Sequence, residues 1–68
     1  MVLDVRDLNG SQLYEKVGNI LGSVSAIRPV FVCINANEDP QKMKSFMEKA
    51  GFSAKIYNRK DGYVLKPR

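Results

Sequence analysis

Hydrophobic and polar residues are spaced along the chain in six segments that alternate between strand-like and helix-like patterns. The first segment, Val2–Leu8, alternates apolar and charged residues, which predicts a short strand. Leu3 and Val5 are expected on one side of this strand. Asp4 and Arg6 are expected on the other side.

The second segment is predicted to be a helix, because its apolar residues recur at intervals of three and four. Asn9-Gly10-Ser11 separates it from the strand, and the side chain of Asn9 or Ser11 is expected to cap its free N–H groups. Gly22-Ser23 weakens the last turns, so we expect the helix to fray after Leu21. The apolar stripe comprises Leu13, Val17, Ile20, Leu21 and Val24.

A second helix is predicted to begin at Asp39-Pro40. Aspartate is a favoured N-cap, and proline at the first helical position loses no hydrogen bond. Gly51 stands where a left-handed residue usually ends a helix, and Phe52 is expected to pack back on the last turn. The apolar stripe comprises Met43, Phe46, Met47 and Ala50.

Three further segments are predicted to be strands. Val30–Ile34 is a continuous apolar run, typical of a strand that is covered to some degree on both faces. Ser53–Asn58 alternates, and Arg59–Gly62 contains the Asp-Gly pair of a hairpin turn. Tyr63–Lys66 is expected to form the last strand, whose facing the pattern leaves open.

The order β-α-β-α-β-β predicts a two-layer α/β sandwich with a mixed four-stranded sheet, formed by residues 1–68 as one domain. The two crossovers should make the first three strands parallel, and the hairpin adds an antiparallel strand. Two helices with one apolar stripe each are expected on one face of the sheet. The other face should be partly open, and parity could place on it Phe31, Cys33, Lys55 and Tyr57.

Composition excludes several kinds of chemistry. The 68 residues include no histidine and one cysteine, so no Ser-His-Asp or Cys-His nucleophile and no Cys/His zinc site can be formed by one chain. Met43 and Met47 have core spacing, and Asp4 and Asp7 should face opposite ways on a strand. We therefore expect no catalytic residue, no metal site and no cofactor.

A cytoplasmic location is the default expectation, because a single thiol forms no intramolecular disulfide. No apolar stretch approaches the roughly 20 residues that cross a bilayer, so no membrane association is expected. The first seven residues, Met1–Asp7, alternate charge with apolar residues and lack the apolar core of a signal peptide.

Two segments and the element order resemble the TusA/SirA-like sulfur-carrier family. The first is Leu3–Leu8 followed at once by a helix, and the second is Cys33-Ile34-Asn35 with Glu38-Asp39-Pro40 opening the next helix. The closing strands around Asp61-Gly62 fit as well. The resemblance implies a two-layer sandwich with a mixed four-stranded sheet. This fold is shared with the ribosome-binding C-terminal domain of bacterial translation initiation factor three.

The sulfur-carrying residue of that family is absent at the matching position. The family places a Cys-Pro pair at the start of its first helix, where the helix N-terminus favours a thiolate that carries a persulfide sulfur. Here that pair falls on Gly10-Ser11, and a serine hydroxyl cannot hold a persulfide. The chain thus resembles a Cys-less branch, which implies a non-catalytic binding module with a protein partner rather than an enzyme.

Three alternatives remain open from the residues. Cys33 could carry sulfur as a non-standard thiol, although a buried cysteine at mid-strand with no nearby cation is expected to be inert. Asn9, Gly10 and Ser11 could bind an anion or a partner carboxylate instead of only capping a helix. A homodimer could form through an open sheet face with exposed aromatics.

An RNA-associated role is the alternative that rests on charge. The net charge of +4 results from eleven lysines and arginines against seven aspartates and glutamates. Cations bind phosphates and aromatic rings stack on unpaired bases. The residues that could form such a face gather in the final hairpin and across the sheet: Arg6, Lys55, Tyr57, Arg59, Lys60, Tyr63 and Lys66.

Overall fold

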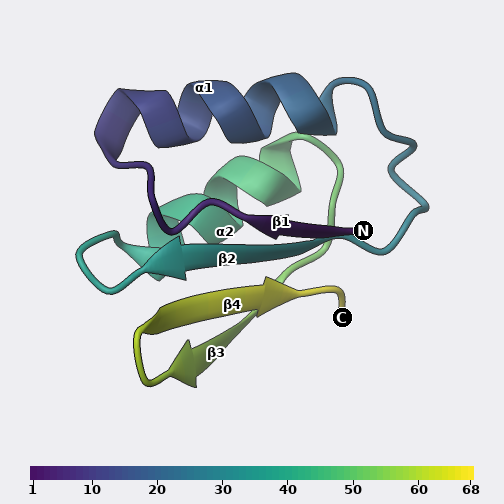
Figure 1. The fold of residues 1–68 in the computed structure, drawn as a ribbon. Coiled ribbons are helices and arrows are strands. Elements are labelled where there is room, and N and C mark those ends of the chain that lie inside the picture. The colour runs from purple at the N-terminus through teal and green to yellow at the C-terminus, as the bar shows by residue number, and fades with distance from the viewer.

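The computed structural model describes residues 1–68 and contains two helices and a four-stranded mixed sheet in the expected order (Figure 1). Neither helix has the length and apolarity needed to cross a membrane. The elements are β1 (Val2–Asp4), α1 (Gly10–Leu21), β2 (Phe31–Asn35), α2 (Pro40–Lys49), β3 (Lys55–Arg59) and β4 (Gly62–Lys66).

The sheet has the strand order β1-β2-β4-β3, so the last strand is inserted between the second and the third. β1 pairs with β2 in parallel, and β4 is antiparallel to both of its neighbours. β3 therefore runs in the same direction as β1 and β2, as predicted, but pairs with neither. This insertion makes β1 and β3 the two edges of the sheet.

Both helices lie on one face of the sheet, which confirms the two-layer sandwich (Figure 1). The apolar stripes of the helices bury Leu13, Val17, Met43 and Met47 completely, and removal of these side chains from water drives the packing. Ala50 is exposed, contrary to the prediction, because α2 ends at Lys49 and the chain turns there. The strands contribute to the same core Val5, Val32, Ile34 and Leu65.

The two helices contact each other through an aromatic pair. The rings of Tyr14 and Phe46 meet edge to face, with their centroids 5.0 Å apart. A Cβ on Gly18 would lie 3.2 Å from the tip of the Phe46 ring, so glycine makes room for this ring between the helices. Burial raises the pKa of the Tyr14 hydroxyl, and the charges of Glu38 and Asp39 act in the same direction.

The signals at both ends of α2 are confirmed. Asp39 adopts an extended backbone, and its carboxylate accepts a hydrogen bond of 2.9 Å from the backbone N–H of Gln41. Pro40 is the first residue of the helix. Gly51 has a φ of 92°, which L-residues rarely adopt, and Phe52 is buried beside the last turn.

The first strand is shorter than predicted. Pairing with β2 stops after the bond from the Val5 N–H to the Cys33 carbonyl, and a turn begins there. Beyond this point the side-chain amide of Asn35 donates to the carbonyl oxygens of Arg6 and Leu8, at 3.2 and 3.0 Å. A side chain thus replaces the strand partner for residues 6–8.

The remaining boundaries differ by one or two residues. β2 extends one residue beyond the predicted Val30–Ile34, to Asn35, because Asn35 pairs with Gly62. The hairpin turn is reduced to Lys60-Asp61, since Arg59 pairs with Gly62 and both belong to strands.

Candidate binding face of the sheet

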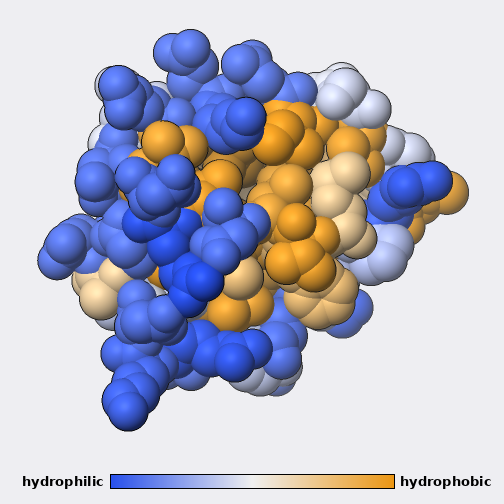
Figure 2. Space-filling model, viewed as in Figure 1, coloured by the Kyte–Doolittle hydropathy of each residue, from blue (hydrophilic) through white to orange (hydrophobic).

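The face of the sheet that the helices leave uncovered carries a row of side chains from all four strands. The register aligns Asp4, Cys33, Val64 and Tyr57, and directly paired residues point to the same side of a sheet. The neighbouring row begins with the pair Val2 and Phe31. Figure 2 shows a hydrophobic centre bordered by hydrophilic residues on the side of the molecule that faces the reader.

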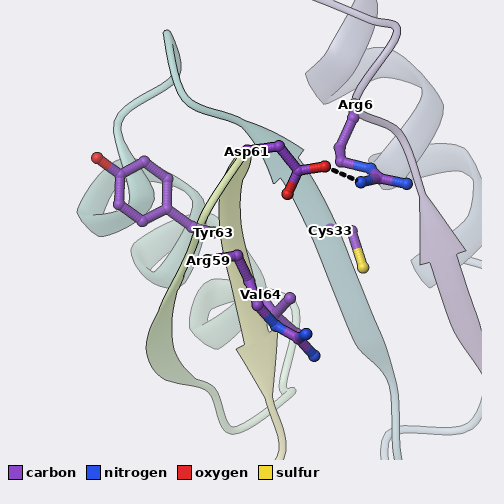
Figure 3. A pocket seen from close by; sticks show the side chains of 6 residues that line it. All are labelled: Arg6, Cys33, Arg59, Asp61, Tyr63 and Val64. Carbon is purple, nitrogen blue, oxygen red and sulfur yellow. Dashed lines mark hydrogen bonds and ion pairs between the residues drawn. The ribbon is translucent and has the colours of Figure 1, made fainter.

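The last strand presents Val64 and Lys66 to this open face and Leu65 to the helices. Tyr63 shares the helix side with Leu65, and its side chain packs against the core rather than on the open face. Of the predicted nucleic-acid face, it only borders the pocket that Arg6 and Arg59 also line. Figure 3 shows its ring pointing away from Cys33. The sequence pattern did not show which residues of the last strand point to the helices. The pairing of β4 with both neighbours decides this.

Lysines converge on Tyr57 at the β3 edge. Lys55 and Lys66 lie directly opposite each other on β3 and β4. Their ammonium groups are 5.7 and 4.4 Å from the centre of the Tyr57 ring, and Tyr57 as a residue is 40% exposed. Neither lysine has an ion-pair partner in the chain. The three residues therefore form an uncompensated cationic cluster around one aromatic ring.

This cluster borders an open basin of about 550 Å³. The basin reaches from the β3 edge to α2 and is lined by Lys44, Lys55, Tyr57, Pro67 and Arg68. Arg68 is anchored there, because its guanidinium pairs with Glu48 at 3.3 Å and donates to the carbonyl of Ala54. Arg59 and Lys60, at the end of β3 and in the turn, are exposed and also have no ion-pair partner. We call Lys55, Tyr57, Lys66 and this basin the cationic basin.

Arg6 lies at the other end of the open face and is held by two carboxylates. It pairs with Asp4, with Nη2 2.6 Å from Oδ2 and Nε 2.8 Å from Oδ1, and with Asp61 in the hairpin turn (Figure 3). The pairs join the chain after β1 to the β3–β4 turn across the sheet. Arg6 is thus on the predicted face, but its charge is already compensated.

The contact with Arg6 lowers the pKa of Asp4 from its usual 3.8 to about 2. The side-chain hydrogen bond from Arg6 contributes most, followed by the bond from its backbone N–H. The same ion pairs raise the pKa of Arg6 above its usual value. Both groups are therefore charged at every pH at which proteins usually work.

Acid titration is expected to show the effect of the Arg6 ion pair on the pKa of Asp4. Because the pKa of Asp4 is lower in the folded protein, the pair stabilises the fold fully above about pH 4. This contribution is lost as the pH falls through about 2. An NMR titration of the Asp4 carboxyl carbon should give a midpoint of about 2. In Arg6→Gln the midpoint should return toward 3.8, and an unchanged midpoint would contradict the assigned cause.

Cys33 is half-buried on the open face, contrary to the expectation of a buried residue with no nearby cation. It lines a pocket of about 200 Å³ together with Arg6 and Arg59 (Figure 3). The arginines come from the segment after β1 and from β3, so their approach to the thiol is a product of the tertiary structure. The residues next to Cys33 in the sequence do not indicate that arginines share its pocket.

The N-terminus of α1 is already bound to a carboxylate from another segment of the chain. The Gly10 N–H donates to Oε2 of Glu38 at 3.0 Å, and Asn9 uses its side-chain oxygen to accept from Asn35 rather than to cap the helix. Asn9 occupies the N-cap position, but the predicted side-chain capping by Asn9 or Ser11 is wrong, because Asn35 engages the Asn9 oxygen and Ser11 lies inside α1. An external anion at Asn9, Gly10 and Ser11 would have to compete with Glu38.

No group of three or more histidine, cysteine, aspartate or glutamate side chains is arranged to hold a metal ion. Comparisons with protein-family models, with curated proteins and with solved structures found no match for this chain. The resemblance to the TusA/SirA-like family therefore stays a prediction.

Proposed function

We propose that this protein is a small non-catalytic binding module that holds a polyanionic partner on the open face of its sheet. The observation that carries the proposal is the pair Lys55 and Lys66, which lie directly opposite each other with no acidic partner. Like charges directly opposite each other in such a pair destabilise a sheet. A bound anion removes this repulsion, so the arrangement favours the bound state.

Two further features support a polyanion rather than a single small anion. Lys44, Arg59 and Lys60 extend the positive charge from the basin to the hairpin turn. The net charge of +4 favours association with anions over a distance, in a way that salt weakens.

The acidic groups of the open face support a role without catalysis. Asp4 has a pKa of about 2 and is ionised at neutral pH, so it is poorly suited to exchange protons there. Asp61 is engaged in its ion pair with Arg6. The proposed module therefore acts by binding.

Polyanion binding can be tested with heparin as the probe. The double variant Lys55→Gln/Lys66→Gln is expected to bind heparin about tenfold more weakly at low salt and to show a smaller salt dependence. The matched control, Lys16→Gln/Lys49→Gln, removes the same charge from the exposed surface of the helices and should change affinity less than about threefold. Titration calorimetry at two salt concentrations measures both.

Two outcomes would contradict the proposal. One is absence of heparin binding by the wild-type protein at low salt. The other is an equal loss of affinity in the basin variant and in the control variant, which would show that only net charge matters.

A second candidate is the protein-binding module implied by the TusA/SirA-like resemblance. The observation that favours it is the apolar strip of the open face, in which Val2 is 68% exposed and Phe31 and Cys33 are half-buried. The first partner to test is a second copy of this chain. Sedimentation should then show a dimer that Phe31→Ser disrupts, and a monomer at millimolar concentration would contradict it.

A further inference from the structure

We infer, on the basis of the proposed polyanion binding, that the partner is a single-stranded nucleic acid whose base stacks on Tyr57 and whose phosphates contact Lys55 and Lys66. The inference rests on the combination of an exposed ring and unpaired cations at one place on an open sheet. Each feature alone is common on protein surfaces. Together they match the two parts of a nucleotide, the flat base and the charged phosphate.

The ring of Tyr57 is positioned before any partner binds. Tyr57 is 40% exposed as a residue, and the ammonium groups of Lys55 and Lys66 lie 5.7 and 4.4 Å from the ring centre. Cation–π attraction limits the rotation of an otherwise free surface side chain. A pre-positioned ring loses less conformational entropy when a base stacks on it.

A second aromatic residue extends the surface across the sheet. By continuation of the β2–β4 register, Phe31 lies opposite Lys66, which in turn lies opposite Lys55. Phe31 and Tyr57 lie two strands apart and two residues apart along the strand direction, roughly 12 Å in all. Aromatic side chains on the open face of a four-stranded sheet are a known means of stacking bases, with flanking cations for the backbone. The two neighbouring rows of the open face therefore offer a path for more than one nucleotide.

The same features argue against a double helix and against an acidic peptide. In a duplex the bases are stacked on each other, so their faces are not accessible to Tyr57. An acidic peptide would satisfy the lysines but would have no planar group for the ring. The dependence of binding on the ring itself thus distinguishes single strands from both.

The test uses fluorescence anisotropy with a labelled twelve-nucleotide mixed single-stranded RNA, and with the same strand annealed to its complement. In Tyr57→Leu, binding of the single strand is expected to weaken roughly 5- to 100-fold, the effect of one lost base stack. In the matched variant Tyr57→Phe, which keeps the ring, affinity should stay within about twofold. The salt dependence should remain that of the wild type in Tyr57→Leu and decrease in Lys55→Gln/Lys66→Gln.

A second measurement does not depend on the variants. In the wild-type protein, the Tyr57 ring protons should shift upfield during titration with the single strand, as expected for a ring stacked on a base. Tyr57 is exposed, so the leucine variant should melt within a few degrees of the wild type.

The possible results separate this inference from the proposed function. Equal affinity of Tyr57→Leu and wild type, or equal affinity for single strand and duplex, would overturn the inference and leave polyanion binding intact. Competition by polyglutamate as strong as by RNA at the same charge would overturn it in favour of an acidic protein. Absence of binding to both RNA and heparin at low salt would overturn both.

Discussion

Gly62→Ala is expected to leave the protein largely unfolded. Gly62 is a buried residue of β4 with a φ of 157°, paired with Asn35 on β2 and with Arg59 on β3. A Cβ at this position would lie 2.1 Å from the carbonyl oxygen of Ile34. The obstructing atom belongs to the backbone of β2, so it can move only if the central strands separate.

The expected cost of this change is on the order of 3 kcal/mol or more. A domain below roughly 70–80 residues rarely has more than about 3–5 kcal/mol of stability. Far-UV circular dichroism without denaturant shows whether Gly62→Ala is folded, and urea denaturation measures the stability of the wild type and of any folded variant. Gly10→Ala is the control, because Gly10 has a φ of 55° but an added Cβ would meet no atom within 4 Å. It should cost only about 1–2 kcal/mol, and equal stability of the two variants would show that the clash is not decisive.

Leu65→Ala should be the most damaging change in the apolar core. Leu65 is completely buried at the centre of the sheet, between Val32 on β2 and Ile56 on β3. It points to the helices and belongs to the main core cluster. Truncating a buried leucine costs about 2–5 kcal/mol, because contacts are lost and a cavity remains. In a protein of this size such a loss is comparable with the total stability.

Thermal unfolding provides the measurement. Each kcal/mol lowers the melting temperature of a domain this small by about 4–8 °C, so Leu65→Ala should melt at least roughly 10 °C below the wild type. Leu65→Met retains the volume and should lose less than about 1.5 kcal/mol. Val2→Ala, at an exposed position, should have almost no effect. A similar loss from Val2→Ala would be incompatible with the assignment of the core to the helix side.

Local patterns were sufficient for much of the fold. The apolar stripes containing Met43 and Val17 predicted both helices, and Asp39-Pro40 predicted the start of α2 at the correct residue. The alternation in the first segment put Leu3 and Val5 on one side of the strand and Asp4 and Arg6 on the other. In the structure Val5 lies in the core and Asp4 in the row on the open face. These features depend on residues within four positions of each other, which a sequence shows directly.

The candidate site was only partly predictable for the same reason. Lys55, Tyr57 and Lys66 were expected in one cationic surface, because they flank one hairpin. Tyr63 was expected there too, but the register of β4 turns it to the helix side. The presence of Arg6 beside Asp61, 55 positions away, has no local signal at all.

The amino-acid sequence therefore determined which segments become helices and strands, and which end of the chain carries the positive charge. The insertion of β4 between β2 and β3 was decided only in three dimensions, and with it the residues that share the open face. The physical reason is the two-residue period of a strand. A shift of one position in the pairing moves every side chain of the strand to the other face of the sheet, and the pairing is formed with strands that are distant in the sequence. Likewise, the cations near Cys33 arrive from distant segments, through packing that no short stretch of sequence encodes.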